Sequence, residues 1–409
     1  MSDRSEWIET AAAIGARLVA NAIWHEDRCT WLGDAMEFVD GEWRVVHRTC
    51  GVALYDGTSG VALFLGRLYR ATGDPLVRAT ALGALRHSFA NAGSLTPGGR
   101  LGLYSGLPGV ALAALDAGKA LADEELSVRG DQLLQTLTPD SDDGEGLDVI
   151  GGAAGTIPLL LQFGGDRASE LARSLGDRLL ERADRANGSA SWTTMPTPDG
   201  RNLTGYSHGA AGIALALLEL GVVTRDERFL AMGRAGVEYE RQLYNRVEGN
   251  WPDLRFPAAE GSDVPCSTAW CHGAPGIGLA RLRTFELSGD SEARIEAETA
   301  LAATRRAVDR TARAGVLDFS LCHGLTGMAE LFVSAEATLG DATLTRVAQQ
   351  VGGWGVERLK ARLPWPCGVP NGGETPALLT GLAGIGHFYL RLADSEHVPS
   401  VLLLKGQAA

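Results

Sequence analysis

The chain has 409 residues, of which 45% are hydrophobic and 21% charged, and its formal net charge is -13. This balance is typical of a globular protein with a large core, and the acidic charge argues against a nucleic-acid-binding protein, which would present a basic surface. The six cysteines are too widely spaced for a disulfide scaffold, and the sequence begins without the apolar segment of a signal peptide. No uncharged apolar run reaches the ~18 residues of a membrane span, so we expect none, and a cytoplasmic location with reduced thiols.

In chain order, the segment FVDGEWRVV (residues 38–46) predicts a short hairpin, and a repeating pattern follows it to the end of the chain. Each copy is Gly-x-x-Gly followed by an apolar helical run, and the first glycines of successive copies are 46 to 64 residues apart. The seven glycine pairs are Gly57 and Gly60, Gly106 and Gly109, Gly152 and Gly155, Gly209 and Gly212, Gly273 and Gly276, Gly324 and Gly327, and Gly381 and Gly384. Between them lie more polar helical stretches with one apolar stripe, at residues 75–90, 121–137, 166–185, 225–243, 289–312 and 340–362.

Helices that are apolar on nearly all sides alternate here with amphipathic helices, which predicts two concentric layers. Each repeat is long enough for two helices, so the expected fold is all-α: a double α/α toroid of seven inner and seven outer helices, with one glycine-pair motif per repeat. Residues 1–409 would form a single domain. Because glycine allows tight turns and close approach of helices, we expect all seven pairs at one end of the toroid, around its mouth.

The residue before the first glycine of each copy should face this mouth. His208, His272 and His323 occupy that position, and Cys271 and Cys322 precede two of them. Thiolate and imidazole groups at neighbouring helix ends are suitable zinc ligands. Cys271 with Cys322 and His323 would form a catalytic site with one open position, whereas the same three residues with His272 would close a structural site, and the residue pattern leaves both sets open. We expect structural or incidental roles for the remaining candidates, Cys29, Cys50, Cys266, Cys367, His87 and His387.

Three motifs around these residues, SHGAAGI, AWCHGAPGIGLARL and LCHGLTGMAE, resemble the lanthionine synthetase C-like family. LYDGTSGVALFLGRLYRATGD near the start is similar to that family's first repeat, and the resemblance covers nearly the whole chain. It implies a double α-toroid with zinc at the mouth, held by Cys271, Cys322 and His323 with the fourth position open. It also implies that His208 is the acid/base histidine and that Asp148 lies beside it.

Two positions depart from the stand-alone class I cyclases of this family. Ser267 stands four residues before Cys271, where those cyclases usually carry arginine, and His272 stands where they usually carry tyrosine. The WCHG form is more similar to the cyclase domain of class II lanthipeptide synthetases, which carry a dehydratase domain upstream. We therefore expect either a separate dehydratase that supplies the substrate or a chain that is an excised domain.

The resemblance predicts a lanthipeptide cyclase, which adds cysteine thiols of a dehydrated precursor peptide to dehydroalanine or dehydrobutyrine and forms (methyl)lanthionine rings. A free thiol has a pKa near 8.5, so only about 3% is ionised at pH 7, whereas zinc ionises a bound thiol outright. The resulting enolate must be protonated at its α-carbon, a step suited to histidine. We assign it to His208, oriented by Asp148, with His272 as second candidate, either as proton donor or as the partner that fixes His208.

Two other functions fit the same residues. Zinc would also serve the addition of an external thiol, such as glutathione, to a dehydrated peptide. A closed zinc site would instead belong to a non-catalytic, peptide-binding scaffold. Protein prenyltransferases also activate a peptide thiol with zinc inside an α/α barrel, but their ligand set normally includes Asp and their barrel usually has six hairpins, which disfavours them here.

Overall fold

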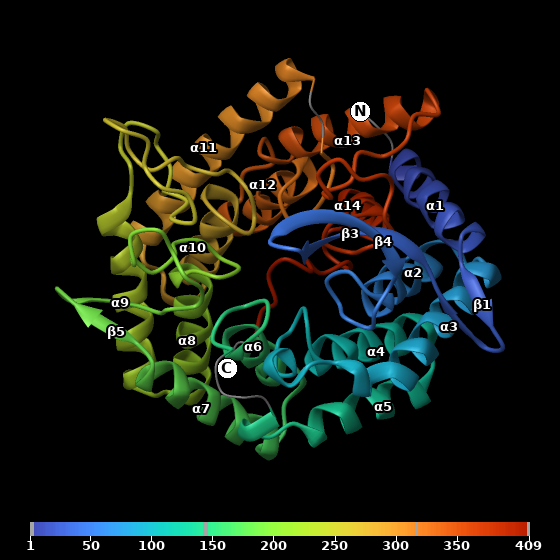
Figure 1. Cartoon of the computed structure of the whole chain (residues 1–409), viewed down its shortest axis with the longest axis horizontal. Helices are drawn as coiled ribbons and strands as arrows, with labels where there is room; N and C mark the ends of the chain where they lie inside the picture. The colour runs from blue at the N-terminus through green and yellow to red at the C-terminus, as the bar shows by residue number, and fades with distance from the viewer. Residues whose placement is uncertain (1–3, 142–145, 316–317, 407–409) are drawn as a thin grey trace.

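The computed structural model describes residues 4–141, 146–315 and 318–406, and these residues form fourteen α-helices in two concentric rings (Figure 1). The inner ring consists of α2 (Thr58–Thr72), α4 (Leu107–Leu121), α6 (Ala153–Phe163), α8 (Ala210–Thr224), α10 (Ala274–Ser288), α12 (Leu325–Leu339) and α14 (Leu382–Ala393). The outer ring consists of α1 (Arg4–Ala20), α3 (Pro75–Asn91), α5 (Glu124–Thr136), α7 (Asp166–Glu181), α9 (Glu227–Leu243), α11 (Ser291–Ala314) and α13 (Thr345–Lys360). The predicted all-α double toroid is confirmed. None of the helices in these described ranges has both the length and the hydrophobicity that crossing a membrane requires.

The rings close because both ends of the chain contribute. Consecutive inner helices pack against one another, and α14 returns to α2. Six outer helices lie in the predicted polar stretches, whereas the seventh, α1, comes from an N-terminal segment to which we assigned no helix. Its buried face, with Trp7, Ile14 and Leu18, packs against α14 and α2 and so completes the outer ring.

Short connections join six inner helices, α2 to α12, to the outer helices that follow them in the described chain. Inner helix α2 ends at Gly73, which has φ of 70°, and the next residue, Asp74, accepts a hydrogen bond of 2.8 Å from Leu76 N in the first turn of α3. A left-handed residue ends one helix and an aspartate cap starts the next, so the chain reverses within two residues. The same arrangement recurs at Ala122 and Asp123, Arg225 and Asp226, and Gly289 and Asp290.

At the mouth, backbone hydrogen bonds join each repeat to the next in a closed circuit. The residues involved stand two positions before the first glycine of each pair. Cys271 N donates to Cys322 O (3.3 Å), and Cys322 N donates to Leu379 O (2.8 Å). At the third repeat the register shifts by one residue: Ile150 O accepts the bond from the second repeat, whereas Val149 N donates the bond to the fourth. The other donor and acceptor pairs are Leu379 and Tyr55, Tyr55 and Tyr104, Tyr104 and Ile150, Val149 and Ser207, and Ser207 and Cys271.

The second glycine of each pair is required by space. A Cβ atom on it would lie between 1.9 and 2.2 Å from the carbonyl oxygen of the residue six positions earlier, far closer than the 3.0 Å below which real Cβ contacts essentially never fall. The glycines concerned are Gly60, Gly109, Gly155, Gly212, Gly276, Gly327 and Gly384. The expected close approach is therefore present, and it presses each inner helix onto the turn that carries the mouth residues.

The C-terminal segment fills the centre of the inner ring. Tyr104 and Trp270 come from the second and fifth repeats, and their ring centroids lie 5.5 Å apart. The Tyr104 hydroxyl donates to Val401 O (2.6 Å), and the Trp270 indole donates to Leu402 O (3.0 Å). Leu402 is fully buried. The toroid is thus a packed core rather than an open pore.

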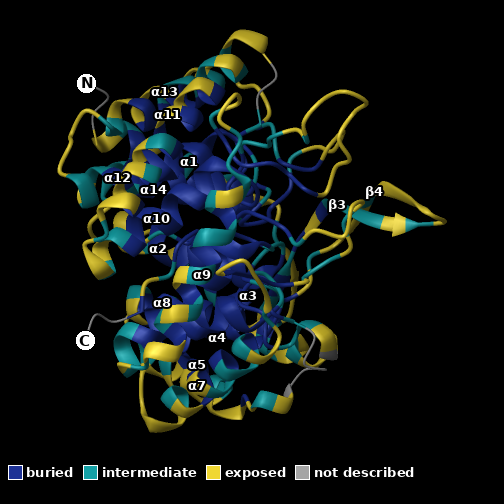
Figure 2. Ribbon diagram, turned by 90° about the vertical axis from the view of Figure 1, so that its left-hand side faces the viewer, coloured by how far each residue is buried: buried dark blue, intermediate teal, exposed yellow. Residues whose placement is uncertain are grey.

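The hairpin predicted at residues 38–46 is present but longer. Strand β3 (Leu32–Val39) pairs with β4 (Glu42–Thr49) through a turn at Asp40 and Gly41, whose φ values are 54° and 83°. The hairpin stands away from the helical body (Figure 2), and its end exposes Phe38 and Trp43. Two shorter hairpins were not predicted: β1 (Ile23–His25) with β2 (Arg28–Thr30), and β5 (Asp184–Ala186) with β6 (Ser189–Ser191).

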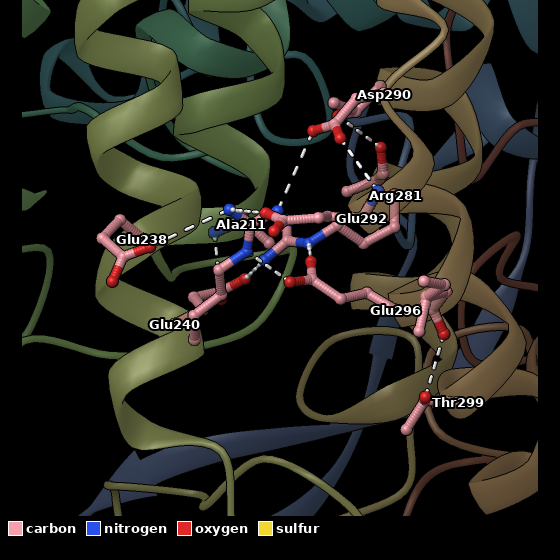
Figure 3. Close-up of polar contacts among 12 residues, drawn as sticks. Ala211, Glu238, Glu240, Arg281, Asp290, Glu292, Glu296 and Thr299 are labelled. Carbon is pink, nitrogen blue, oxygen red and sulfur yellow. Dashed lines mark hydrogen bonds and ion pairs between the residues drawn. The ribbon is translucent and has the colours of Figure 1, made fainter.

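A buried charge network joins α9, α10 and α11 (Figure 3). Glu240 is fully buried, and its carboxylate accepts from Gly205 N (2.8 Å), Ala211 N (3.1 Å) and Arg281 Nη2 (2.9 Å). Burial raises the pKa of Glu240, and the Arg281 charge opposes that rise. Arg281 also contacts Glu296. The network therefore fixes the start of α8 from the outer ring.

Removal of the Arg281 cation should be strongly destabilising. Arg281→Met leaves the buried Glu240 carboxylate without its ion-pair partner, and we expect a loss of about 3–5 kcal/mol in the free energy of unfolding. Arg294 is the matched control, because its ion pair with Glu298 lies on the surface of α11 with both side chains 50% exposed. Arg294→Met should cost less than about 1 kcal/mol. Urea unfolding monitored by circular dichroism measures both, and equal losses would contradict the assignment.

Candidate metal centre

Cys271, Cys322 and His323 meet at the mouth of the toroid, just before α10 and α12. The backbone bond between the two cysteines holds neighbouring repeats together at this point. Their sulfur atoms and one His323 ring nitrogen all lie within 4.8 Å of one another. Among residues 4–141, 146–315 and 318–406, these three side chains are the group of His, Cys, Asp or Glu residues whose donor atoms lie close enough together to hold a metal ion.

The two thiols differ in acidity. The hydrogen bond with Cys322 lowers the pKa of Cys271 well below its usual range, although burial acts in the opposite direction. The same hydrogen bond, burial and the negative charge of Cys271 raise the pKa of Cys322. Of the two cysteines, Cys271 therefore loses its proton more readily. Its thiolate forms although the side chain is buried.

The His323 ring is oriented by the chain around it. Its Nε2 donates a hydrogen bond of 2.7 Å to Gly368 O and lies 3.5 Å from Asp318 Oδ2. A metal-binding histidine commonly donates its second ring nitrogen to such a carbonyl or carboxylate. Burial opposes protonation of His323, but its contact with Cys271 and the Asp318 charge raise its pKa to about 9.

The three donors fit zinc. Tetrahedral zinc, with sulfur ligands at about 2.3 Å and nitrogen at about 2.0 Å, needs donor atoms roughly 3.5–4 Å apart. The three donor atoms here lie within 4.8 Å of one another, so small side-chain movements would bring them to the distances that zinc requires. His272 is not a member of this group. Among the described residues the donor set has three side chains, as in catalytic zinc sites, and not the four of a closed structural site.

His208 and Asp148 form the expected pair. His208 Nδ1 lies 2.6 Å from Asp148 Oδ2, and the second carboxylate oxygen accepts from Gly151 N at 2.7 Å. The carboxylate thereby fixes the ring and its tautomer and leaves Nε2 for a further partner. The preceding residue, Ser207, donates both its N–H and its hydroxyl to Cys271 O, so this histidine is tied to the metal-ligand candidates.

His272 has an unusual environment. Its side chain is 1% exposed, and neither ring nitrogen has a hydrogen-bond partner among the described residues. Burial lowers the pKa of His272 to about 4. Its ring stacks on His208 with centroids 5.9 Å apart and an angle of 28° between planes. A neutral imidazole has no proton to spare for the substrate at neutral pH. His272 therefore suits the role of a partner that holds His208 in place better than the role of proton donor.

One cavity connects the two cysteines with His208. A volume of about 290 Å³ is lined by Cys271, Cys322 and His208 together with Tyr55 and other residues of the mouth. A larger cavity, about 450 Å³, is lined by Arg67, Lys119 and other residues, including the segment after α14, and it contains none of these candidates. The smaller cavity is therefore the one that brings sulfur and imidazole chemistry together.

Sequence reasoning missed two residues near the cysteines. Tyr55 lines the cavity and occupies the same register as the cysteines, two positions before a first glycine, which was a signal we did not use. Arg255 lies in the irregular connection between α9 and α10, where no periodicity marks it. Its guanidinium contacts Asp253 at 2.7 and 2.9 Å, and Ser267 donates to the same carboxylate at 2.6 Å.

Arg255 brings positive charge toward the site. Burial opposes this charge, but the contact with Asp253 and the charges of the two site cysteines raise the pKa of Arg255 above its usual value. Ser267 stands where the class I cyclases usually carry arginine, and here it helps to hold an arginine from another part of the chain.

Several isolated cysteines and histidines lie in the core, as expected. Cys29 is buried and contacts Thr80 O at 3.4 Å, and His387 is buried beside Arg67. Burial raises the pKa of Cys29 to about 12 and that of Cys266 to about 11, so neither thiol is activated.

Three of the known proteins that the chain resembles match it over different lengths. The chain is 23% identical over 209 residues to the lacticin 481/lactococcin biosynthesis protein LcnDR2 of Lactococcus lactis subsp. lactis, which covers 49% of this chain but 22% of that protein's length. It is 25% identical over 294 residues to glutathione S-transferase LANCL1 of Danio rerio, with 68% of each protein covered. The structure matches nisin cyclase with a TM-score of 0.63 and 17% identity, covering 85% of this chain and 89% of that one, which shows a shared fold.

The family assignment rests on a match that covers most of the chain. The family model described as lanthionine synthetase C-like protein matches residues 50–403, from the first repeat through the C-terminal segment in the ring centre. This region includes all seven glycine pairs and the cysteines and histidines of the mouth. The chain therefore belongs to the lanthionine synthetase C-like protein family.

Proposed function

We propose that this protein is a zinc-dependent lanthipeptide cyclase that acts on a precursor peptide dehydrated by a dehydratase, which is either a separate protein or another domain of a longer chain. The observation that carries the proposal is one cavity at the mouth that is lined by Cys271, Cys322 and His208, whose ring is paired with Asp148. The similarity to nisin cyclase in fold and to LcnDR2 in sequence supports the same function.

The metal would be held by Cys271, Cys322 and His323. When bound, zinc supplies the Lewis acidity that lowers the pKa of a peptide thiol and makes its sulfur nucleophilic at neutral pH. The protein's own groups prepare this position. Gly368 and Asp318 orient His323, and the backbone circuit holds the two cysteines on adjacent repeats.

The second half of the reaction needs a proton at the α-carbon. His208 is the proposed donor, because Asp148 holds its Nδ1 and leaves Nε2 for the substrate. His272, neutral and stacked on His208, is the proposed positioning partner. Arg255 would offset the negative charge that develops on the enolate, since its guanidinium is held by Asp253 within electrostatic reach of the cysteines.

A second candidate function is the addition of glutathione to a dehydrated peptide. It is favoured by the similarity to LANCL1 of Danio rerio, which is named a glutathione S-transferase. The sulfur and imidazole groups would act in the same way, and the functions differ in the thiol that occupies the cavity.

Substitution of His208 should separate chemistry from metal binding. His208→Ala is expected to keep one zinc per chain and to lower the cyclisation rate by roughly a hundredfold or more, because general acid catalysis is typically worth 10²–10⁴-fold. The matched control is His397→Ala, which removes an exposed histidine paired with Asp394 at 2.9 Å. Metal analysis and a timed count of free thiols by alkylation and mass spectrometry measure both properties. Normal cyclisation by the His208 variant would refute its assigned role.

Zinc affinity should rise with pH. At neutral pH His323 holds a proton, since its pKa is about 9, and the raised pKa of Cys322 keeps that thiol protonated. These protons must leave when zinc binds, so the apparent Kd should fall about 10- to 100-fold per unit between roughly pH 6.5 and 8. Competition with a chelator of known pH dependence measures the slope. An affinity independent of pH would contradict the ligand set.

The choice of thiol can be tested directly. A peptide with one dehydroalanine and one cysteine is incubated with the zinc-loaded protein in the presence of glutathione. Intramolecular addition removes the free thiol without changing the peptide mass, whereas glutathione addition increases the mass and leaves the cysteine thiol free. We expect the cyclised product to predominate in mass spectrometry, and a predominant glutathione adduct would favour the second function.

A further inference from the structure

The β3–β4 hairpin exposes an apolar face. Phe38 is 64% exposed and Trp43 66%, and the two stand directly opposite each other in the pairing register. Their rings contact edge to face, with centroids 5.6 Å apart. Because alternate residues of a strand share a face, Leu32 and Val45 lie on the same side, and both are also exposed. Contiguous exposed apolar surface of this kind marks a contact with another molecule.

The opposite face of the hairpin is charged, and its charges are paired. Arg44 contacts Glu42 at 3.5 Å, and Arg48 contacts Glu37 at 3.0 Å. Arg48 also donates a hydrogen bond of 3.0 Å to Asp56, whose side chain lines the same cavity as the two site cysteines. This ion pair fixes the base of the hairpin at the edge of the cavity, while the strands stand away from the helical body (Figure 2).

The hairpin is also joined to the candidate metal centre. The carboxylate of Asp34, in β3, accepts a hydrogen bond of 2.6 Å from Gly373 N. Five positions earlier in the same loop, Gly368 O accepts the 2.7 Å bond that orients the His323 ring. A Cβ atom on Gly368 would lie 2.7 Å from His323 Nε2, so the loop passes close against this ring. The hairpin therefore contacts both the cavity wall and the loop that positions a candidate metal ligand.

The chemistry of the proposed substrate fits this face. Dehydration of Ser or Thr removes the hydroxyl group and leaves a planar alkene, so a dehydrated peptide is more apolar than its precursor. Aromatic rings offer broad apolar contact area to such flat groups. When the peptide's cysteine enters the cavity, the residues next to it must leave past the surface around the mouth. The base of the hairpin lies at this edge.

We propose that the apolar face of the β3–β4 hairpin binds the segment of the dehydrated peptide that flanks the reacting cysteine, with Phe38 and Trp43 as the main contacts. The proposal rests on the proposed cyclase function and deepens it by naming where the peptide lies. From Arg48 to Trp43 the strand rises by about 17 Å, which an extended peptide also spans in about five residues. The residues that are recognised should therefore lie about five or more positions from the cysteine.

The first test measures peptide binding without catalysis. The probe is a fluorescently labelled dehydrated peptide in which alanine replaces the cysteine, and anisotropy gives its Kd. The double variant Phe38→Thr/Trp43→Thr removes both rings but keeps residues that favour strands. We expect its Kd to rise about tenfold or more, as for the loss of aromatic contacts at the centre of an interface.

The matched control changes the opposite face of the same strand. Arg44→Thr removes a side chain that is 53% exposed and makes only the long contact with Glu42 among the ion pairs described. Its Kd should equal that of the wild-type protein. Equal affinities of the wild type and the double variant, or an equal loss in Arg44→Thr, would overturn the proposal.

The second test compares a short peptide with a long one. Both contain the same cysteine and dehydroalanine, but one ends about two residues from the cysteine and the other extends about ten residues beyond it. With the wild-type protein, KM should be lower for the long peptide. In the double variant KM should rise for the long peptide alone, with kcat unchanged. An equal change for both peptides would show damage to the cavity and overturn the proposal.

These measurements also separate the proposal from its alternatives. Binding of the alanine-containing peptide without cyclisation of either reactive peptide by the wild type would overturn the proposed function but not the docking surface. Wild-type dimers that dissociate in the double variant, seen by sedimentation, would assign the face to a second copy of the chain. Binding of a purified dehydratase that the double variant alone loses, with unchanged peptide affinity, would assign it to that enzyme. Either of the last two results would overturn the proposal.

Discussion

The backbone circuit at the mouth is the constraint on which the rest of the structure depends. Each of its hydrogen bonds joins the turn before one inner helix to the turn before the next, so residues in equal register become neighbours. Cys271 and Cys322 share a register in adjacent repeats and are therefore held side by side. A single such bond contributes only about 1 kcal/mol net. The circuit is kept in place by the glycines that press each helix onto its turn and by the C-terminal segment in the ring centre.

The position of His208 depends on groups from both rings. On the outer side, the buried Glu240 carboxylate accepts from Gly205 and Ala211, which flank this histidine in the chain. On the inner side, Ser207 binds Cys271 O and links the histidine to the sulfur pair. The charge network between α9, α10 and α11 (Figure 3) thus holds the backbone on both sides of His208. Displacement of α9 would be transmitted to the proposed proton donor.

The repeat made much of this fold predictable. Seven glycine pairs at similar spacing indicated the rings, and the doubled Cys-His-Gly sequence indicated a metal site, because the same register must face the same place. Features outside the repeat could not be found in this way. Helix α1 carries no glycine pair, Arg255 comes from an irregular connection, and the one-residue slip at Ile150 depends on local packing. The turn residues Asp40 and Gly41 indicated a hairpin, but they did not indicate how long the strands of the β3–β4 hairpin would be.

The account depends most directly on a metal with two sulfurs, one imidazole nitrogen and one exchangeable position. X-ray absorption at the zinc edge measures this set, first for the zinc-loaded protein and then after addition of a dehydrated peptide with one cysteine. We predict two sulfur ligands before addition and three after it, with the peptide-bound state trapped in the His208→Ala variant. Four protein ligands before addition, with His272 as the fourth, or an unchanged sulfur count after it, would contradict the account.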